Sequence, residues 1–193
     1  MCSQWLIIFM LFPFLQVDFT SVVGLGGHVE GANNQVDRFG IDESSGYRLT
    51  SKYSGLNLTL LIVFKIGKQA GVEMDHIHRH DNENWHLDRL SDNKYRIQHT
   101  AFKGIGALGI IKDEMKNELC LSKPANVSEQ YWHLTRLSDG SFRLTNDFSG
   151  HNMALYVQAQ GKTYKPIMSK IAANHLGQHW ILTKVQQLLT RCF

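Results

Sequence analysis

The chain has few cysteines and no long run of one charge, and each shortage argues against a class of protein. Only three cysteines occur among 193 residues, so no disulfide framework is indicated, and Cys120 and Cys192 are the only possible pair once Cys2 has left with the N-terminal segment. Lysine and arginine are scattered and the formal net charge is only +3. We therefore expect neither a nucleic-acid binder nor a protein of charged membrane surfaces. The content of 43% hydrophobic and 19% charged residues is typical of one globular domain.

Motifs of known catalytic sites are also missing. There is no Gly-x-Ser-x-Gly, no His-Glu-x-x-His and no phosphate-binding loop. Three alternating histidines, His76, His78 and His80, could form a zinc site, but the residues between them supply no further ligand. We favour a solvated, pH-sensitive loop there, and we expect Cys120 to be a buried, inert thiol. The sequence thus predicts no enzyme, no cofactor and no bound metal.

The N-terminal segment differs from the rest. Residues 5–15 are apolar apart from one proline, and small residues follow at 21–24. This pattern predicts a signal peptide over 1–24 and secretion to the extracellular space. The apolar stretch is too short for a membrane-spanning helix, which needs about 20 residues. A misassigned start or a short anchor is the alternative, because the first four residues carry no Lys or Arg.

Two Asn-x-Ser/Thr acceptor patterns agree with secretion. Asn57 and Asn126 each begin such a pattern and are candidates for glycosylation in a eukaryotic secretory pathway.

An internal repeat is the most informative feature. Tyr-Arg-Leu-Thr at 47–50 recurs as Tyr-Arg-Ile-Gln at 95–98 and Phe-Arg-Leu-Thr at 142–145, with offsets of 48 and 47 residues. A second landmark has the same period, since three tryptophans are spaced by 47 and 48 residues: Trp85, Trp132 and Trp180. Two independent landmarks with one period indicate three copies of a unit of about 47 residues.

Within each unit the apolar residues alternate in short runs separated by turns. Asp-Asn at 92–93 and Asp-Gly at 139–140 are typical of hairpins, and glycine turns occur at 53–55 and 148–150. This pattern predicts four short strands per unit and twelve in all. Three blades cannot close a propeller, and a helical array lacks its 3.6-residue period. We therefore expect an all-β barrel with three-fold symmetry.

The repeat motifs resemble those of ricin B-type β-trefoil lectins, particularly disulfide-poor ones. The resemblance covers about residues 42–186, with an irregular leader at 25–41 and a tail at 187–193. It implies that the three tryptophans belong to the core. It also implies that Gln130 and Gln178 brace a binding loop, whereas Glu83 stands where the first unit should have glutamine.

Sugar binding in that family usually needs an acidic residue after the second strand of a unit. The corresponding positions here are Leu61, Gly109 (or its neighbour Ile111) and Tyr156, and none is acidic. The third unit still combines rings with amides, which could contact a sugar face and its hydroxyls. Its candidate binding residues are Asn152, Tyr156, Gln158, Tyr164, Asn174 and Gln178. The alternative is that these are ordinary surface residues of a degenerate repeat.

The resemblance implies a secreted, non-catalytic protein whose partners are glycans or glycoproteins. The changed acidic positions keep a second hypothesis open, namely a protease inhibitor or other protein-binding trefoil that uses its loops without a sugar pocket. A third is a carbohydrate-binding module separated from a catalytic partner.

Overall fold

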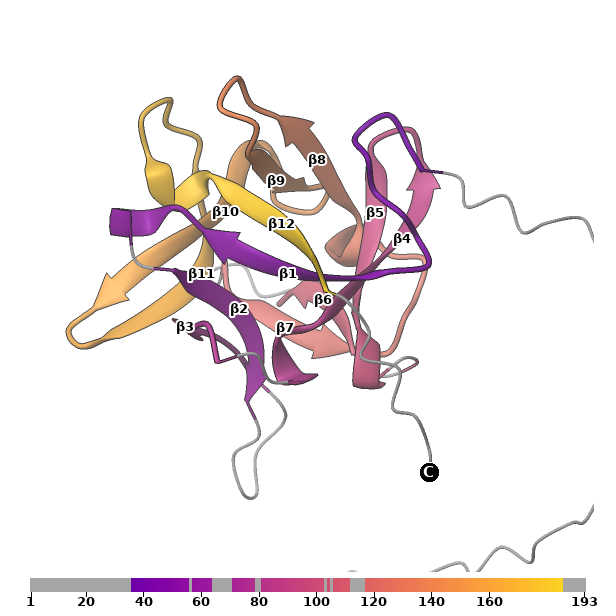
Figure 1. Cartoon of the computed structure of the whole chain (residues 1–193), viewed down its shortest axis with the longest axis horizontal. Helices are drawn as coiled ribbons and strands as arrows, with labels where there is room; N and C mark the ends of the chain where they lie inside the picture. Colours follow the sequence, from indigo (N-terminus) through magenta and orange to yellow (C-terminus); the bar gives the residue numbers. More distant parts are fainter. Residues whose placement is uncertain are drawn as a thin grey trace, which may run out of the picture. The chain divides into compact units, whose positions relative to one another are not determined.

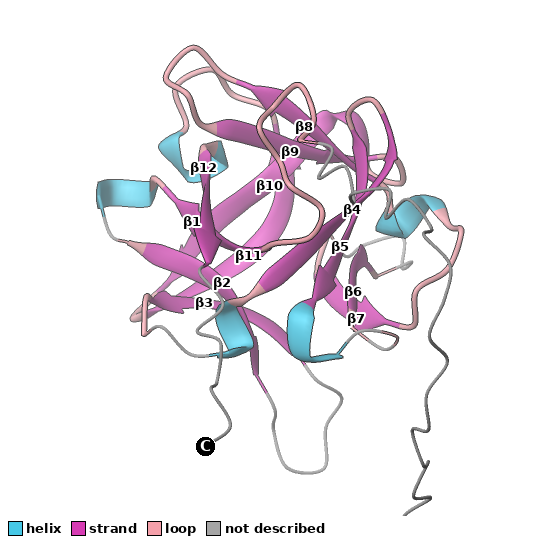
Figure 2. Cartoon of the chain, turned by 45° about the vertical axis from the view of Figure 1, so that its right-hand side comes forward, coloured by secondary structure: helices cyan, strands magenta, loops and turns pink. Residues whose placement is uncertain are grey.

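The computed structural model describes residues 36–55, 57–63, 71–78, 81–102, 104, 106–111 and 117–185. The predicted signal peptide, most of the leader, His80 and the tail lie outside them. The described residues form strands and short 3-10 turns (Figure 2), which confirms the all-β prediction. None of the helices in the described ranges has the length and apolar character needed to cross a bilayer.

Six strands pair in a closed ring. Around the ring, β1 pairs with β4, β4 with β5, β5 with β8, β8 with β9, β9 with β12 and β12 with β1, all antiparallel. Their bounds are β1 (Gly46–Ser51), β4 (Trp85–Ser91), β5 (Lys94–His99), β8 (Trp132–Arg136), β9 (Phe142–Asn146) and β12 (Trp180–Val185). Figure 1 shows β1 beside β12, where the first and last strands close the barrel. A closed barrel leaves no free edge in these six strands.

Three hairpins cap one end of this barrel (Figure 1). In each, the first strand also pairs with a barrel strand: β2 with β1, β6 with β5 and β10 with β9. The hairpins are β2 (Leu58–Val63) with β3 (Gly71–His76), β6 (Ala107–Ile110) with β7 (Leu119–Ser122), and β10 (Gly150–Gln160) with β11 (Thr163–Lys170). Each unit thus supplies two barrel strands and one hairpin, which is the three-fold arrangement expected from the repeat.

The three tryptophans lie in the core in the same way. Each is 0% exposed, and each donates a hydrogen bond from Nε1 to a backbone carbonyl of its own unit's hairpin. The bonds run from Trp85 to Leu60 (2.8 Å), from Trp132 to Leu108 (2.8 Å) and from Trp180 to Leu155 (2.9 Å). Because an indole buries a large apolar area and its N–H needs a partner, this bond fixes each hairpin over the barrel.

Neighbouring units are joined by backbone hydrogen bonds at equivalent places. The residue after the first strand of each unit donates to the residue just before a tryptophan of the adjoining unit. These bonds are Lys52 N to His179 O (2.9 Å), Thr100 N to Asn84 O (3.0 Å) and Asp147 N to Tyr131 O (3.0 Å). The units therefore interlock at each seam around the barrel.

Residues 36–41, at the end of the expected leader, pack on the barrel. Ile41 is 2% exposed, and the ring of Phe39 meets that of Phe142 edge-on at 5.9 Å. The buried carboxylate of Asp37 accepts hydrogen bonds from Phe39 N (2.8 Å), Ile41 N (2.9 Å) and the Tyr95 hydroxyl. Burial and this hydrogen bond raise the pKa of Tyr95 above its ordinary value, so the phenol stays neutral.

Cys120 is a free, half-buried thiol on β7. Burial raises the pKa of this thiol, and the nearby carboxylate of Glu129 adds to the effect. A raised pKa keeps the sulfur protonated and a poor nucleophile.

Candidate functional site

Short 3-10 turns precede each tryptophan and carry the brace residues. They are η2 (Asp81–Glu83), η4 (Ser128–Gln130) and η5 (Leu176–Gln178). The amide of Gln130 accepts from Ala125 N (2.8 Å) and donates to Ser122 Oγ (2.8 Å) and Lys123 O (2.8 Å). The amide of Gln178 likewise accepts from Ala172 N (3.1 Å) and donates to Lys170 O (2.8 Å). Both glutamines are buried, and both hold the loop that leaves the hairpin.

Glu83 holds the corresponding loop of the first unit in a different way. Its Oε1 accepts from His78 N (2.7 Å), as the glutamine oxygens do from their loops. A carboxylate has no amide N–H to donate, and its Oε2 instead accepts from Arg48 Nε (2.8 Å). Since Glu83 is 0% exposed, the guanidinium of Arg48 neutralises a charge that would otherwise be costly to bury.

The positions where the family usually has an acidic residue are occupied here by residues that pack against their neighbours. Leu61 on β2 is 5% exposed, and a Cβ on Gly109 of β6 would lie 3.2 Å from the carbonyl oxygen of Glu129 in η4. On β10, Tyr156 lies against η5, where a Cβ on Gly177 would come within 2.6 Å of its ring. The strand thus packs directly on the turn in the second and third units, and Leu61 is buried in the first. None of these three positions has a carboxylate.

A cluster of four rings gathers where the third unit meets the first. Tyr53, in η1 (Tyr53–Gly55), meets the ring of Tyr156 at 6.5 Å and that of Tyr164 at 5.8 Å between centroids. Tyr156 also meets His175 at 5.8 Å. We call these four residues the tyrosine cluster. The tyrosines are half-buried and His175 is exposed, so each of the four residues is at least partly open to solvent.

The other predicted residues lie at different distances from this cluster. Gln158 is exposed two positions from Tyr156, which puts both on the same face of β10. Asn174 is exposed directly beside His175. Asn152 is exposed four positions from Tyr156, roughly 13 Å along the strand. Gln178 is 0% exposed and its amide is used by the backbone.

The sequence reasoning missed Tyr53 and His175. Tyr53 belongs to the first unit and meets the third only because the barrel closes, so a search within one repeat could not find it. His175 was a loop residue with no periodic signal. An aromatic residue in the turn after a unit's first strand was the available clue.

Ser141, His179 and Asp139 also lie close together, but their arrangement is not that of a catalytic triad. Both Asp139 Oδ2 (3.0 Å) and Ser141 Oγ (3.3 Å) approach the same nitrogen, Nδ1 of His179. A catalytic triad needs the serine on one ring nitrogen and the carboxylate on the other. Ser141 is also 2% exposed. Hydrogen bonds from Ser141 first, and then from His179 and Lys52, hold the pKa of Asp139 well below its usual range.

No group of three or more His, Cys, Asp or Glu side chains is placed to hold a metal ion within the ranges that the structure describes. His76 is exposed on β3, and His78 Nε2 lies 3.5 Å from Asp75 Oδ2. The third histidine of the predicted loop, His80, falls outside those ranges.

No family model and no curated protein matches the sequence. Many solved structures match the fold. The designed three-fold symmetric protein ThreeFoil has a TM-score of 0.62 at 21% identity, over 72% of this chain and 99% of its own. The Macrolepiota procera ricin B-like lectin, solved with lactose, has a TM-score of 0.59 at 17% identity, over 75% of this chain and 99% of its own.

Enzymes also contain this fold as one part. An exo-β-1,3-galactanase from Clostridium thermocellum matches with a TM-score of 0.61 at 18% identity, over 75% of this chain but only 31% of its own. In several matched structures the chain spans less than half of the other protein. At these identities the comparisons show the fold alone. They confirm a β-trefoil with ricin B-like lectins among its structural neighbours.

Proposed function

We propose that the chain is a secreted, non-catalytic carbohydrate-binding protein whose glycan contacts centre on the tyrosine cluster. The observation that carries the proposal is the meeting of Tyr53, Tyr156 and His175 beside two exposed amides, Gln158 and Asn174. Partly exposed rings can cover the apolar face of a pyranose. Amides both donate and accept hydrogen bonds, as sugar hydroxyls require.

The proposed site differs from a single-unit pocket. It combines the third unit with η1 of the first. None of its four residues is acidic, whereas the sugar sites of the family usually have a carboxylate. Its hydrogen bonds to sugar would therefore be neutral ones, which are weaker than charge-assisted bonds. We expect weak affinity for a single sugar and little dependence of that affinity on salt.

The proposal includes the signal peptide over 1–24, the glycosylation of Asn57 and Asn126, and glycans or glycoproteins as partners. It takes the chain to act by itself and not as the binding part of an enzyme. The filled family positions at Leu61, Gly109 and Tyr156 favour one alternative, a trefoil that binds proteins, such as a protease inhibitor.

A glycan array separates the two functions. The mature chain should bind a subset of glycans, and Asn174→Ala or Gln158→Ala should weaken that binding about two- to tenfold, the effect of one hydrogen bond. His151→Ala is the matched control, because His151 is exposed on the same strand as Gln158 but lies five positions from Tyr156, roughly 16 Å along the strand. Absence of glycan binding together with inhibition of a protease would establish the alternative.

A further inference from the structure

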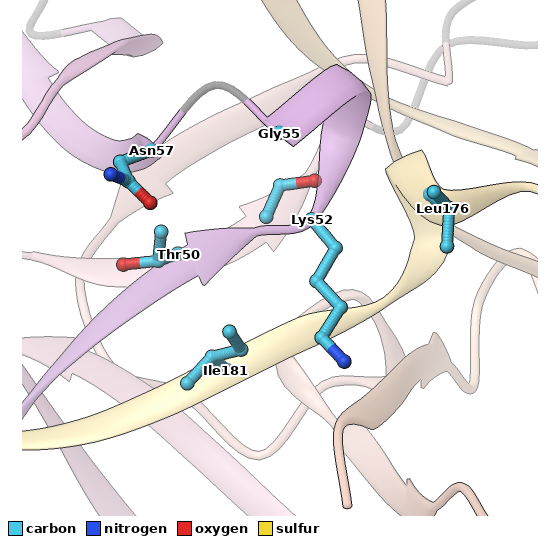
Figure 3. A pocket seen from close by; sticks show the side chains of 7 residues that line it. Thr50, Lys52, Gly55, Asn57, Leu176 and Ile181 are labelled. Atoms are coloured by element: carbon cyan, nitrogen blue, oxygen red, sulfur yellow. The ribbon is translucent and has the colours of Figure 1, made fainter. Parts of the chain in front are cut away.

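A groove lies at the seam where the third unit, which ends with β12, meets the first unit, which begins with β1. Its volume is about 290 Å³, and its walls come from the end of β1 and the following turn on one side and from η5 and β12 on the other. Figure 3 shows the residues that line it: Thr50, Ser51, Lys52, Gly55, Asn57, Leu176 and Ile181. Leu176 is 50% exposed and Ile181 is 40% exposed, so the groove presents aliphatic side chains to solvent.

The other two units have polar residues at the two positions that Leu176 and Ile181 occupy. Leu176 is the first residue of its 3-10 turn, where the other turns have Ser128 and Asp81. Ile181 is the second residue of β12, where the other strands have His133 and His86.

Both of these histidines are paired with a carboxylate. His133 Nε2 lies 2.5 Å from Asp147, and His86 Nε2 lies 2.9 Å from Asp88. The third unit therefore has aliphatic residues at two positions where the other two units have polar ones. A group that covered this exposed aliphatic pair would remove apolar surface from water, which is favourable.

Asn57 is placed where a group attached to it could reach this pair. It is exposed, lines the same groove and begins the Asn57-Leu58-Thr59 acceptor pattern. In Figure 3 it lies at one end of the groove and Leu176 at the other, with the Lys52 side chain between them. The ammonium of Lys52 is paired with Asp139 at 3.0 Å, so the aliphatic part of the Lys52 side chain is available as a further wall.

We propose that an N-linked glycan on Asn57 folds back over this groove and covers Leu176 and Ile181. The proposal rests on the secretion included in the proposed function. The first sugar, N-acetylglucosamine, has a methyl group and an apolar ring face that fit aliphatic side chains. Its hydroxyls remain toward water.

The modification precedes folding. Thr59, the third residue of the acceptor pattern, is 0% exposed, and its Oγ1 donates to Leu49 O at 3.1 Å in the folded chain. A transferase must therefore read the unfolded segment. A bond forms between Asn57 Nδ2 and C1 of the sugar, and the bond between C1 and the pyrophosphate of a lipid-linked oligosaccharide breaks. The amide loses one proton and the lipid pyrophosphate leaves.

Asn126 provides a matched control inside the same chain. It also begins an acceptor pattern and is exposed, but it lies in the loop before η4 and does not line the groove. Its Oδ1 accepts a hydrogen bond from the guanidinium of Arg96 at 2.9 Å. A glycan there would lie beside Val127, which is 40% exposed, and away from Leu176 and Ile181.

The test compares glycosylated full-length protein, made in a eukaryotic secretory host, with Asn57→Gln and Asn126→Gln made in the same way. Intact mass reports occupancy, and thermal unfolding reports stability. We expect a glycan on Asn57, and a fall in Tm of about 2–4 °C for Asn57→Gln that is larger than the fall for Asn126→Gln. A glycan-free Asn57, or equal Tm values for both variants, overturns the proposal.

A second variant keeps the glycan and replaces the two aliphatic side chains of the groove with residues from another unit. Leu176→Ser with Ile181→His installs the residues of the second unit. In that background Asn57→Gln should no longer lower Tm, and an unchanged fall contradicts the proposal. Binding on a glycan array depends on the tyrosine cluster and is measured separately, so either proposal can fail while the other holds.

Discussion

Arg48 and Glu83 form the one arginine–acid contact among three equivalent positions in the described units. Arg48 Nε lies 2.8 Å from Glu83 Oε2, whereas Nε of the corresponding arginines, Arg96 and Arg143, is buried without a hydrogen-bond partner. The other two units have glutamine in place of Glu83. One substitution in the first unit has therefore turned a neutral brace into an ion pair.

Two substitutions at Glu83 should have very different costs. Glu83→Ala leaves Arg48 without its carboxylate and removes the acceptor of His78 N, so we expect a loss of about 3 kcal/mol in unfolding free energy. Glu83→Gln can accept from His78 N as Gln130 does from Ala125 N, and should cost less than about 1 kcal/mol. Urea unfolding measures both. Equal losses would show that the charge itself, not the bracing, is required.

His99 should make the stability of the protein depend on pH. It is 0% exposed, its Nδ1 accepts from Ala101 N at 3.3 Å, and its ring meets Trp85 edge-on at 5.3 Å. Burial lowers its pKa below 6.5, and the carbonyls of Asn82 and Asp81 offset only part of this. Between the folded and unfolded pKa values the unfolded state binds more protons, so stability is present above pH 6.5 and is lost as pH falls.

His99→Asn tests this prediction with a residue that the fold already uses. Asn146 is the equivalent residue of the third unit, and its amide donates to Glu129 O (2.9 Å) and accepts from Phe148 N (2.9 Å). The variant should unfold with a smaller loss of free energy between pH 7.5 and pH 5 than the parent chain. Parallel curves for the two proteins would assign the pH dependence to other groups.

Asp37 should contribute more stability than its place near the N-terminal end suggests. Asp37→Ala removes the acceptor for two backbone N–H groups and for the Tyr95 hydroxyl, and should lower the unfolding free energy by about 2–4 kcal/mol. Asp37→Asn keeps the acceptor oxygen for the backbone and should cost less. In a double-mutant cycle with Tyr95→Phe, additive losses would contradict a direct coupling.

Gly177→Ala should displace Tyr156. The added Cβ would lie 2.6 Å from Tyr156 Cε2 and 3.1 Å from Tyr53 Cδ2, which is too close for either ring to stay in place. We expect a cost of about 1–3 kcal/mol and weaker glycan binding. Tyr156→Leu in the same chain should recover the stability but not the binding. Recovery of both would remove Tyr156 from the proposed site.

The sequence predicted the features that depend on the alternation of apolar and polar residues along each strand. Tyr47, Tyr95 and Phe142 occupy equivalent inward positions on equivalent strands, and so do the three tryptophans. All of these residues are buried in the structure. The turn residues before each tryptophan were also readable, because Gln-x-Trp has a fixed spacing. The three-fold, all-β architecture therefore followed from the sequence.

Contacts across the closed barrel could not be predicted in this way. Tyr53 reaches Tyr156 and Tyr164 only after β1 pairs with β12, more than a hundred positions later. The packing at the family's acidic position was equally impossible to predict. There Tyr156 on β10 packs on Gly177 in η5, and the small glycine leaves room for the large ring. Such matches depend on tertiary distance, which alternation does not encode.

The closure of β1 on β12 also has a consequence for how fast the protein folds. Gly46 pairs with Val185, so one sheet contact joins the two ends of the described domain. Bringing such distant segments together costs chain entropy before any contact repays it. A single unit lacks the neighbour that satisfies its backbone, so stepwise growth from one stable unit is disfavoured. We therefore expect the closed ring to fold slowly and in an all-or-none way.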